Sequence, residues 1–149
     1  MRDRSMNLDA TRDPRQRAKM KKMQNLKDCP FCRHNLKVLH DAPIEREGTW
    51  WSITRNDYPY EGTRVHYLAI AHEHLTHISE LTPEAFAELG TLMQELAREH
   101  DVDGGALFMR FGNVMKTGAT IAHLHVHLIV GASEHSQNPE KLKVTLGYR

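Results

Sequence analysis

Cysteine is scarce in this sequence of 149 residues: there are two, both in the segment Cys29-Pro-Phe-Cys32. A lone Cys-x-x-Cys in a reducing compartment indicates metal or redox chemistry rather than a framework of disulfides. Long apolar runs are absent too, since none approaches the roughly 20 residues that cross a membrane. The basic N-terminus contains no apolar segment, so we expect no signal peptide, no membrane partner and a cytoplasmic location.

A strong net charge is also missing, because the formal net charge is only +1. That small value hides an asymmetry: residues 1–28 contain nine Lys/Arg against four Asp, which leaves the rest of the chain acidic. The body is therefore not expected to bind nucleic acid, and only the tail has the charge to do so. We expect a basic polar extension at residues 1–25, with its first dozen residues disordered or loosely attached, and one domain at residues 26–149.

Apolar spacing predicts an α+β fold with a mainly antiparallel sheet. Thr82-Pro83-Glu84 is a typical helix start, and Phe86, Leu89, Met93 and Leu96 follow at spacings of three and four. A glycine-bearing loop, 112–118, precedes the last long strand. The predicted strands are 49–55, 65–71, 106–111, 123–130 and 141–148, and the predicted helices are 15–26 and 83–100.

The most informative segment is His123-Leu-His-Val-His-Leu-Ile-Val130. Strict alternation predicts a strand in which His123, His125 and His127 share one face, because side chains at i, i+2 and i+4 do so. Imidazole can act as nucleophile, base or metal ligand near neutral pH, so such a row suits catalysis. The alternative is a half-exposed strand that carries histidines by coincidence.

The pattern His-φ-His-φ-His-φ-φ, in which φ is apolar, resembles that of the histidine triad (HIT) superfamily. The resemblance extends over about 28–130 and implies the HIT-like fold, with one long helix between the two central hairpins. It also implies an enzyme that acts on nucleotides, and a homodimer that pairs through the long helix and an adjoining strand. The wide apolar stripe of Leu92, Met93 and Leu96 is a further hint of such an interface.

Cys29 and Cys32 require further ligands to complete a tetrahedral zinc site, because the chain has no second cysteine pair. Spacing leaves many histidines as candidates, and a redox pair or free thiols as alternatives. In zinc-containing HIT proteins the set is completed by a histidine after the second strand and by the first triad histidine. The resemblance therefore implies a structural zinc held by Cys29, Cys32, His74 and His123.

The resemblance also implies that His125 attacks the α-phosphate of a nucleotide and becomes a nucleotidyl-histidine. On the same face, His127 is expected to donate to a phosphate oxygen or to the leaving group. A covalent intermediate divides one difficult displacement into two easier ones, which suits a neutral imidazole. A histidine rather than a glutamine at position 127 favours hydrolysis over nucleotidyl transfer.

Nucleotide contacts are expected from two further segments. In the loop before the triad, Asn113 and Thr120 offer neutral donors to phosphate, beside glycines that allow close approach of the backbone. HIT hydrolases usually read Gly-Gln-Ser/Thr there, whereas this chain has Ala119 in place of the glutamine. Asn56, in a turn that resembles the family's Asn-x-φ-Pro-Tyr, is expected to contact the ribose, although a plain turn also explains the segment. A purine nucleotide is the expected substrate.

Other functions stay open from the sequence. Phosphorolysis by a dinucleoside polyphosphate phosphorylase, or nucleotidyl transfer, fits the same residues. A catalytic metal shared by two triad histidines is a second class, although no carboxylate follows the triad until Glu134. A non-catalytic nucleotide-binding or interaction protein is a third class, for which the missing glutamine and the basic tail leave room.

Overall fold

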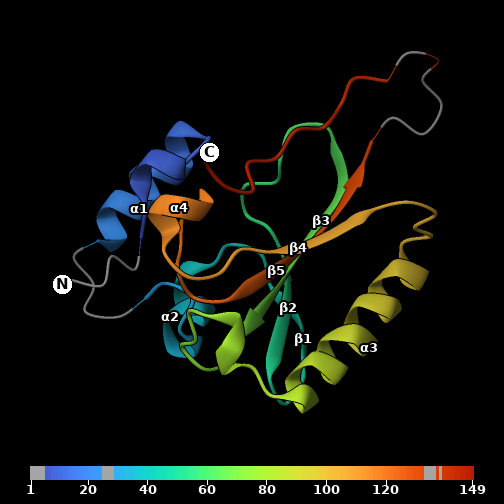
Figure 1. Cartoon of the computed structure of the whole chain (residues 1–149), viewed down its shortest axis with the longest axis horizontal. Coiled ribbons are helices and arrows are strands. Elements are labelled where there is room, and N and C mark those ends of the chain that lie inside the picture. Colours follow the sequence, from blue (N-terminus) through green and yellow to red (C-terminus); the bar gives the residue numbers. More distant parts are fainter. Residues whose placement is uncertain (1–5, 25–28, 133–136, 138) are drawn as a thin grey trace.

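The structure is a computed structural model that describes residues 6–24, 29–132, 137 and 139–149 (Figure 1). Within this part of the chain, no helix is long and apolar enough to cross a membrane. The strands are β1 (Ile44–Glu47), β2 (Trp51–Arg55), β3 (Thr63–Ala71), β4 (Ala106–Met109) and β5 (His125–Gly131). The helices are α1 (Pro14–Met23), α2 (Arg33–Leu39), α3 (Pro83–Glu99) and α4 (Val114–Thr117), with short 3-10 turns at Leu8–Ala10 and Ile78–Glu80.

The strands form one five-stranded sheet in the order β1-β2-β3-β5-β4, and all neighbours are antiparallel. The long helix α3 connects β3 to β4, so the predicted α+β fold and its long helix between the hairpins are confirmed. In the β3–β5 pair, Leu68 lies opposite His127 and Ile70 opposite His125. The two triad histidines of β5 therefore lie near the middle of the sheet.

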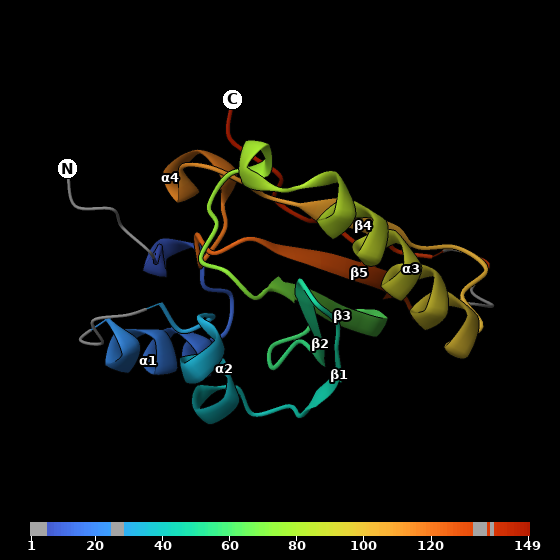
Figure 2. The ribbon, with the colours of Figure 1, turned by 90° about the horizontal axis from the view of Figure 1, so that it is seen from below.

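The two faces of the sheet are covered differently (Figure 2). On one face, α3 packs against the apolar core, which includes Trp51, Tyr67 and Leu124. On the other face lie α1 and α2, and Leu36 of α2 packs against Leu68 of β3. Because strand residues alternate between faces, the triad histidines lie on the side of α1 and α2.

The expected start of the long helix is confirmed. The Thr82 side chain accepts a hydrogen bond from Ala85 N at 3.2 Å, and Pro83 occupies the first helical position, where a missing N–H costs nothing. The helix expected at residues 15–26 is α1, although its predicted end at Leu26 lies outside the described residues. So does the proposed domain boundary between residues 25 and 26.

The prediction that the first dozen residues are disordered or loosely attached is wrong for residues 6–12. Met6 is buried and forms an antiparallel bridge with Ile121, and Asn7 N donates to Thr120 O at 2.7 Å. Behind them, α1 buries Met20 and Met23 in the same apolar cluster. Met20 and Met23 belong to the helix predicted at residues 15–26, but a single apolar residue such as Met6 gives no periodic signal in the sequence.

Two other expectations are corrected. The strand predicted at residues 141–148 is wrong, since no strand forms in the described C-terminal residues. This segment is instead held by single hydrogen bonds: Arg110 Nε donates to the Thr145 carbonyl at 2.8 Å, and Tyr148 N donates to Lys116 O at 3.3 Å. The predicted loop 112–118 contains the short helix α4, whose N-cap is Asn113 and whose C-cap Gly118 has a φ of 74°.

The apolar stripe on α3 does not mark an interface. Leu92, Met93 and Leu96 are buried in the subunit's own core, against the sheet. Phe86 is the large apolar residue of this helix that stays exposed. The apolar stripe of α3 therefore gives no support to the predicted homodimer.

Candidate functional site

The three triad histidines lie in a row on one face of the sheet. His125 and His127 belong to β5, and His123 lies just before it. All three are buried, and their rings are close to one another, with centroids of His125 and His127 5.0 Å apart. The alternating pattern forces this arrangement, because the intervening Leu124 and Val126 are needed in the core beneath α3.

Backbone carbonyls determine which nitrogen of each imidazole carries the proton. His125 Nδ1 lies 2.7 Å from His123 O, and His123 Nε2 lies 2.6 Å from Ala71 O. A carbonyl only accepts hydrogen bonds, so each of these ring nitrogens must be the protonated donor. His125 is left with a lone pair on Nε2, and His123 with a lone pair on Nδ1.

A second chain of hydrogen bonds fixes His127 through His66 of β3. The Tyr60 N–H donates to His66 Nδ1 at 3.1 Å, which leaves the proton of neutral His66 on Nε2. That Nε2 donates to His127 Nδ1 at 2.9 Å. The proton of His127 then resides on its Nε2, a buried atom without a hydrogen-bond partner among the described residues.

Burial keeps these imidazoles uncharged at neutral pH. Desolvation is the main cause that lowers the pKa of His125 to about 4 and the pKa of His66 to about 3. It also lowers the pKa of His127 well below its ordinary value, with the nearby His125 and His66 as further causes. A neutral imidazole retains the lone pair that a nucleophile requires.

A pocket opens over His125 and His127. Its apolar wall is contributed by α1, the segment around α2, β3 and Ile121, and the ring of Phe31 lies edge-on to His125 with centroids 5.1 Å apart. The apolar lining comprises Met20, Met23, Pro30, Phe31, Leu36, Leu39, Leu68 and Ile121. Thr120 and Asn56, both predicted to bind nucleotide, also line it. The pocket thus combines an apolar wall with two triad histidines.

The Asn56 side chain has an amide group available for a ligand. Its Oδ1 accepts from Tyr58 N at 2.9 Å, and its Nδ2 lies 3.1 Å from His66 Nε2. Because that His66 nitrogen carries a proton, it cannot accept a further hydrogen bond from the amide. The amide N–H groups of Asn56 therefore remain for a ligand.

Asn113 is not brought to the pocket. Its side chain is exposed and accepts a hydrogen bond from Met115 N at 2.9 Å, which caps α4. Ala119, at the position of the family's glutamine, is buried against Val114 and Ala122. Of the residues that the loop was expected to contribute, only Thr120 faces the pocket.

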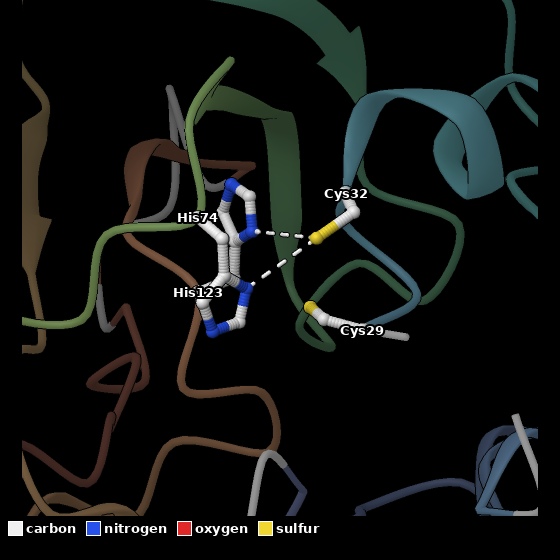
Figure 3. Close-up of side chains that lie close together, drawn as sticks. All are labelled: Cys29, Cys32, His74 and His123. Carbon is white, nitrogen blue, oxygen red and sulfur yellow. Dashed lines mark hydrogen bonds between the residues drawn. The ribbon is translucent and has the colours of Figure 1, made fainter. Parts of the chain in front are cut away.

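The four predicted metal ligands meet beside the triad (Figure 3). Ligand atoms of Cys29, Cys32, His74 and His123 all lie within 4.8 Å of one another. Cys32 Sγ is 3.4 Å from His74 Nδ1 and 3.9 Å from His123 Nδ1, the nitrogen that holds a lone pair. Both cysteines are free of disulfides. This donor set fits a tetrahedral metal site with no open position.

Residues that the sequence did not single out complete the pocket. Tyr60 stacks on His127 with centroids 5.9 Å apart, and Arg12 and Arg110 line the same pocket. The sequence left His66 among the histidines that could bind a metal, in the segment after the Asn-x-φ-Pro-Tyr turn, whereas the structure places it behind His127. Arg12 lies in the segment that was expected to be disordered or loosely attached.

The chain is similar to known proteins over most of its length. Residues 29–143 match the family model described as "Scavenger mRNA decapping enzyme C-term binding". No curated protein sequence matches the chain.

Three solved structures illustrate the similarity of fold. A HIT family hydrolase from Clostridium thermocellum has 24% identity and a TM-score of 0.58, with 79% of this chain and 100% of that chain covered. A zinc-bound histidine triad family protein from Mycobacterium smegmatis has 24% identity and a TM-score of 0.53, with 77% and 81% covered. A histidine triad nucleotide-binding protein from Candida albicans has 15% identity and a TM-score of 0.57, with 76% and 87% covered. The match over most of the chain shows that this protein belongs to the scavenger mRNA decapping enzyme C-terminal family, within the histidine triad superfamily.

Proposed function

We propose that the protein is a nucleotide hydrolase that acts at the α-phosphate through a nucleotidyl-histidine intermediate on His125. The observation that carries this proposal is the hydrogen bond of 2.7 Å between His125 Nδ1 and His123 O. It holds the imidazole in the tautomer whose Nε2 is a nucleophile, on a side chain that lines the pocket. As Nε2 bonds to phosphorus, the same carbonyl stabilises the positive charge that develops on the ring.

The reaction proceeds in two displacements. The lone pair of His125 Nε2 attacks the α-phosphorus, and the bond from phosphorus to the leaving group breaks with its electron pair on the leaving group. Water then attacks the same phosphorus, its proton passes to solvent, and the P–N electron pair returns to Nε2 as the nucleoside monophosphate departs. His127 Nε2–H, which lacks a partner among the described residues, donates to the departing oxygen or to a phosphate oxygen.

The nucleoside is proposed to occupy the apolar end of the pocket. Phe31, Leu36 and Leu39 provide a flat apolar surface of the kind that stacks on a base, and a purine offers the larger area for it. Asn56 contacts the ribose hydroxyls through its remaining amide N–H groups, and Thr120 contacts the phosphate.

The cofactor is proposed to be one structural zinc ion. Two thiolates and two imidazoles are the donors that zinc prefers in sites closed to solvent ligands. His123 would bind through Nδ1, since its Nε2 donates to Ala71 O. The zinc would thereby hold the start of β5, from which His125 projects. Thiolate ligands require a reducing environment, which is why the cytoplasm is the proposed location.

The test is to trap the intermediate with an adenosine nucleotide that is radiolabelled at the α-phosphate. We expect acid-labile label on the protein after rapid denaturation, none with His125→Ala, and slower formation with His127→Ala. Asn113→Ala, outside the pocket, is the matched control and should trap as much label as the wild type. If the nucleotide binds but neither labels the protein nor is converted to product, the protein would be a nucleotide-binding protein instead.

A further inference from the structure

Two arginines from distant parts of the chain meet on the ring of Tyr60. The guanidinium carbon of Arg12 lies 3.9 Å from the ring centroid, and its Nη2 donates to Tyr58 O at 3.1 Å. Arg110 Nη2 donates to the Tyr60 hydroxyl at 3.2 Å, and its Nε donates to Thr145 O. Within the described residues, no carboxylate pairs with either arginine. Two positive charges are therefore placed together without a negative partner.

These charges lie on the His127 side of the pocket. The Tyr60 ring is nearly parallel to that of His127, at 14°, and Phe108 stacks on His127 with centroids 4.4 Å apart. The Arg110 guanidinium lies 4.9 Å from the centroid of Phe108. The apolar wall that suits a base lies at the other end, beside His125. A nucleotide seated with its base on that wall would direct its leaving group toward the arginines.

The basic end of the pocket continues into a second, open groove. Arg12, Tyr60 and Arg110 line both the pocket and this groove, which has a volume of about 1240 Å³ and lies between the N-terminal segment and the C-terminal residues. That volume exceeds the range of ordinary small-molecule sites, so the space beyond the arginines is large enough for a bulky leaving group.

We propose that Arg12 and Arg110 form a subsite for a phosphate of the leaving group, so that these two residues determine how strongly the site prefers a phosphorylated leaving group. The inference rests on the proposed function. The bond that breaks joins the α-phosphorus to the bridging oxygen, whose electron pair stays on the departing phosphate. Guanidinium groups bind phosphate through paired N–H donors and stabilise this developing charge. A neutral amine leaving group would gain nothing from them.

Arg12 lies outside the residues that match the family, 29–143, so part of this subsite comes from the N-terminal extension. The docked N-terminal segment holds it there: Lys19 of α1 pairs with Asp57 at 3.2 Å, and α1 buries Gln16 and Met20. Substrate choice would therefore be determined partly by the extension, whose basic charge would serve the active site rather than nucleic acid.

The experiment compares two probes that share the adenosine 5′-phosphoryl group. Diadenosine tetraphosphate has a phosphorylated leaving group, and adenosine 5′-phosphoramidate has an amine. For Arg12→Gln we expect the ratio of the two kcat/KM values, tetraphosphate over phosphoramidate, to fall about tenfold or more, the size of one lost charge-assisted hydrogen bond. Arg12→Lys, which keeps the charge, should restore part of that ratio. Arg17→Gln is the control, since Arg17 lies nearby on α1 in the same N-terminal segment and lines neither pocket nor groove.

The outcomes separate the subsite from the proposed function. An unchanged ratio in Arg12→Gln, even with lower rates on both probes, would show that Arg12 only anchors the N-terminal segment, and would overturn the subsite. Cleavage of the phosphoramidate alone by the wild type would overturn the subsite and leave the proposed function standing. Cleavage of neither probe would remove the proposed function and the subsite with it.

Discussion

His66 Nε2 lies 2.9 Å from His127 Nδ1, and the Tyr60 N–H on the far side of His66 determines the direction of that hydrogen bond. The backbone amide of Tyr60, between β2 and β3, thereby selects the tautomer of His127 on β5. In this account His66 is a positioning residue, since it acts on substrate only through His127.

Replacing His66 tests this relationship. His66→Ala should lower kcat about tenfold to a hundredfold with a small change in KM, because His127 then loses the donor that keeps its proton on Nε2. His66→Gln, which offers an N–H near the same position, should recover part of the loss. Steady-state kinetics on a cleaved nucleotide measure both. A kcat for His66→Ala within twofold of the wild type would contradict the positioning role.

The buried histidines predict a loss of stability in acid. The folded pKa of His66 is about 3, below its ordinary value of 6.5, so between these values the unfolded chain binds more protons. Its contribution is fully present above pH 6.5 and falls by about 1.4 kcal/mol for each pH unit below that, toward pH 3. Urea unfolding at pH 7, 6 and 5 gives the change in the free energy of unfolding with pH. In His66→Asn this pH dependence should be smaller by the equivalent of about one bound proton. The metal ligands are common to both proteins, so equal slopes would rule out this contribution from His66.

Zinc content distinguishes the four predicted ligands from neighbouring histidines. Metal analysis should find about one zinc per chain in the wild type, and well under half an equivalent of zinc per chain in Cys32→Ser. Each kcal/mol lost lowers the melting temperature by roughly 2–4 °C in a chain of this size, so we expect a fall of several degrees or more. His72→Gln should retain its zinc, because His72 Nε2 bonds Ser52 Oγ at 3.0 Å outside the cluster. Less than half an equivalent of metal in the wild type, prepared without added zinc, would count against the site.

A homodimer remains a prediction, and the structure changes where we expect its interface. β4 is an edge strand, and Leu107 on it is 55% exposed. Pairing of two β4 edges about a twofold axis would make one continuous sheet. Light scattering should give about twice the chain mass of 17.2 kDa, and Leu107→Asp should lower it toward one chain. Val38→Asp, on an exposed position of α2, is the control. A wild-type mass near that of a single chain would end the dimer prediction.

The parts of the fold with regular spacing were predictable from the sequence. Alternation placed His125 and His127 on one face, and the cap at Thr82 located α3, because each signal depends only on neighbours in the chain. β1 and α2 were missed, since Ile44–Glu47 alternates charges on an exposed edge and Arg33–Leu39 has only two turns with one buried residue. Such short elements are stabilised mainly by tertiary contacts.

The chemistry of the site was less predictable than its location. The resemblance to a family selected His74 and His123 from several histidines that spacing left equal, and the structure brings them together with both cysteines. Tautomers could not be predicted, because they depend on carbonyls such as Ala71 O, distant in the sequence. Arg12 could not be predicted either, since its position depends on a docked segment that carries no periodic apolar pattern.

The central claim is that His125 is the nucleophile, and the most direct measurement is single-turnover release of product by His125→Ala beside the binding of the same nucleotide by calorimetry. We expect a rate lower by about a thousandfold or more, equal to several kcal/mol of lost transition-state stabilisation, with affinity within a few-fold of the wild type. Retained nucleotide binding and zinc would show that the variant is folded. Product release at more than about a tenth of the wild-type rate would contradict a covalent mechanism through this histidine.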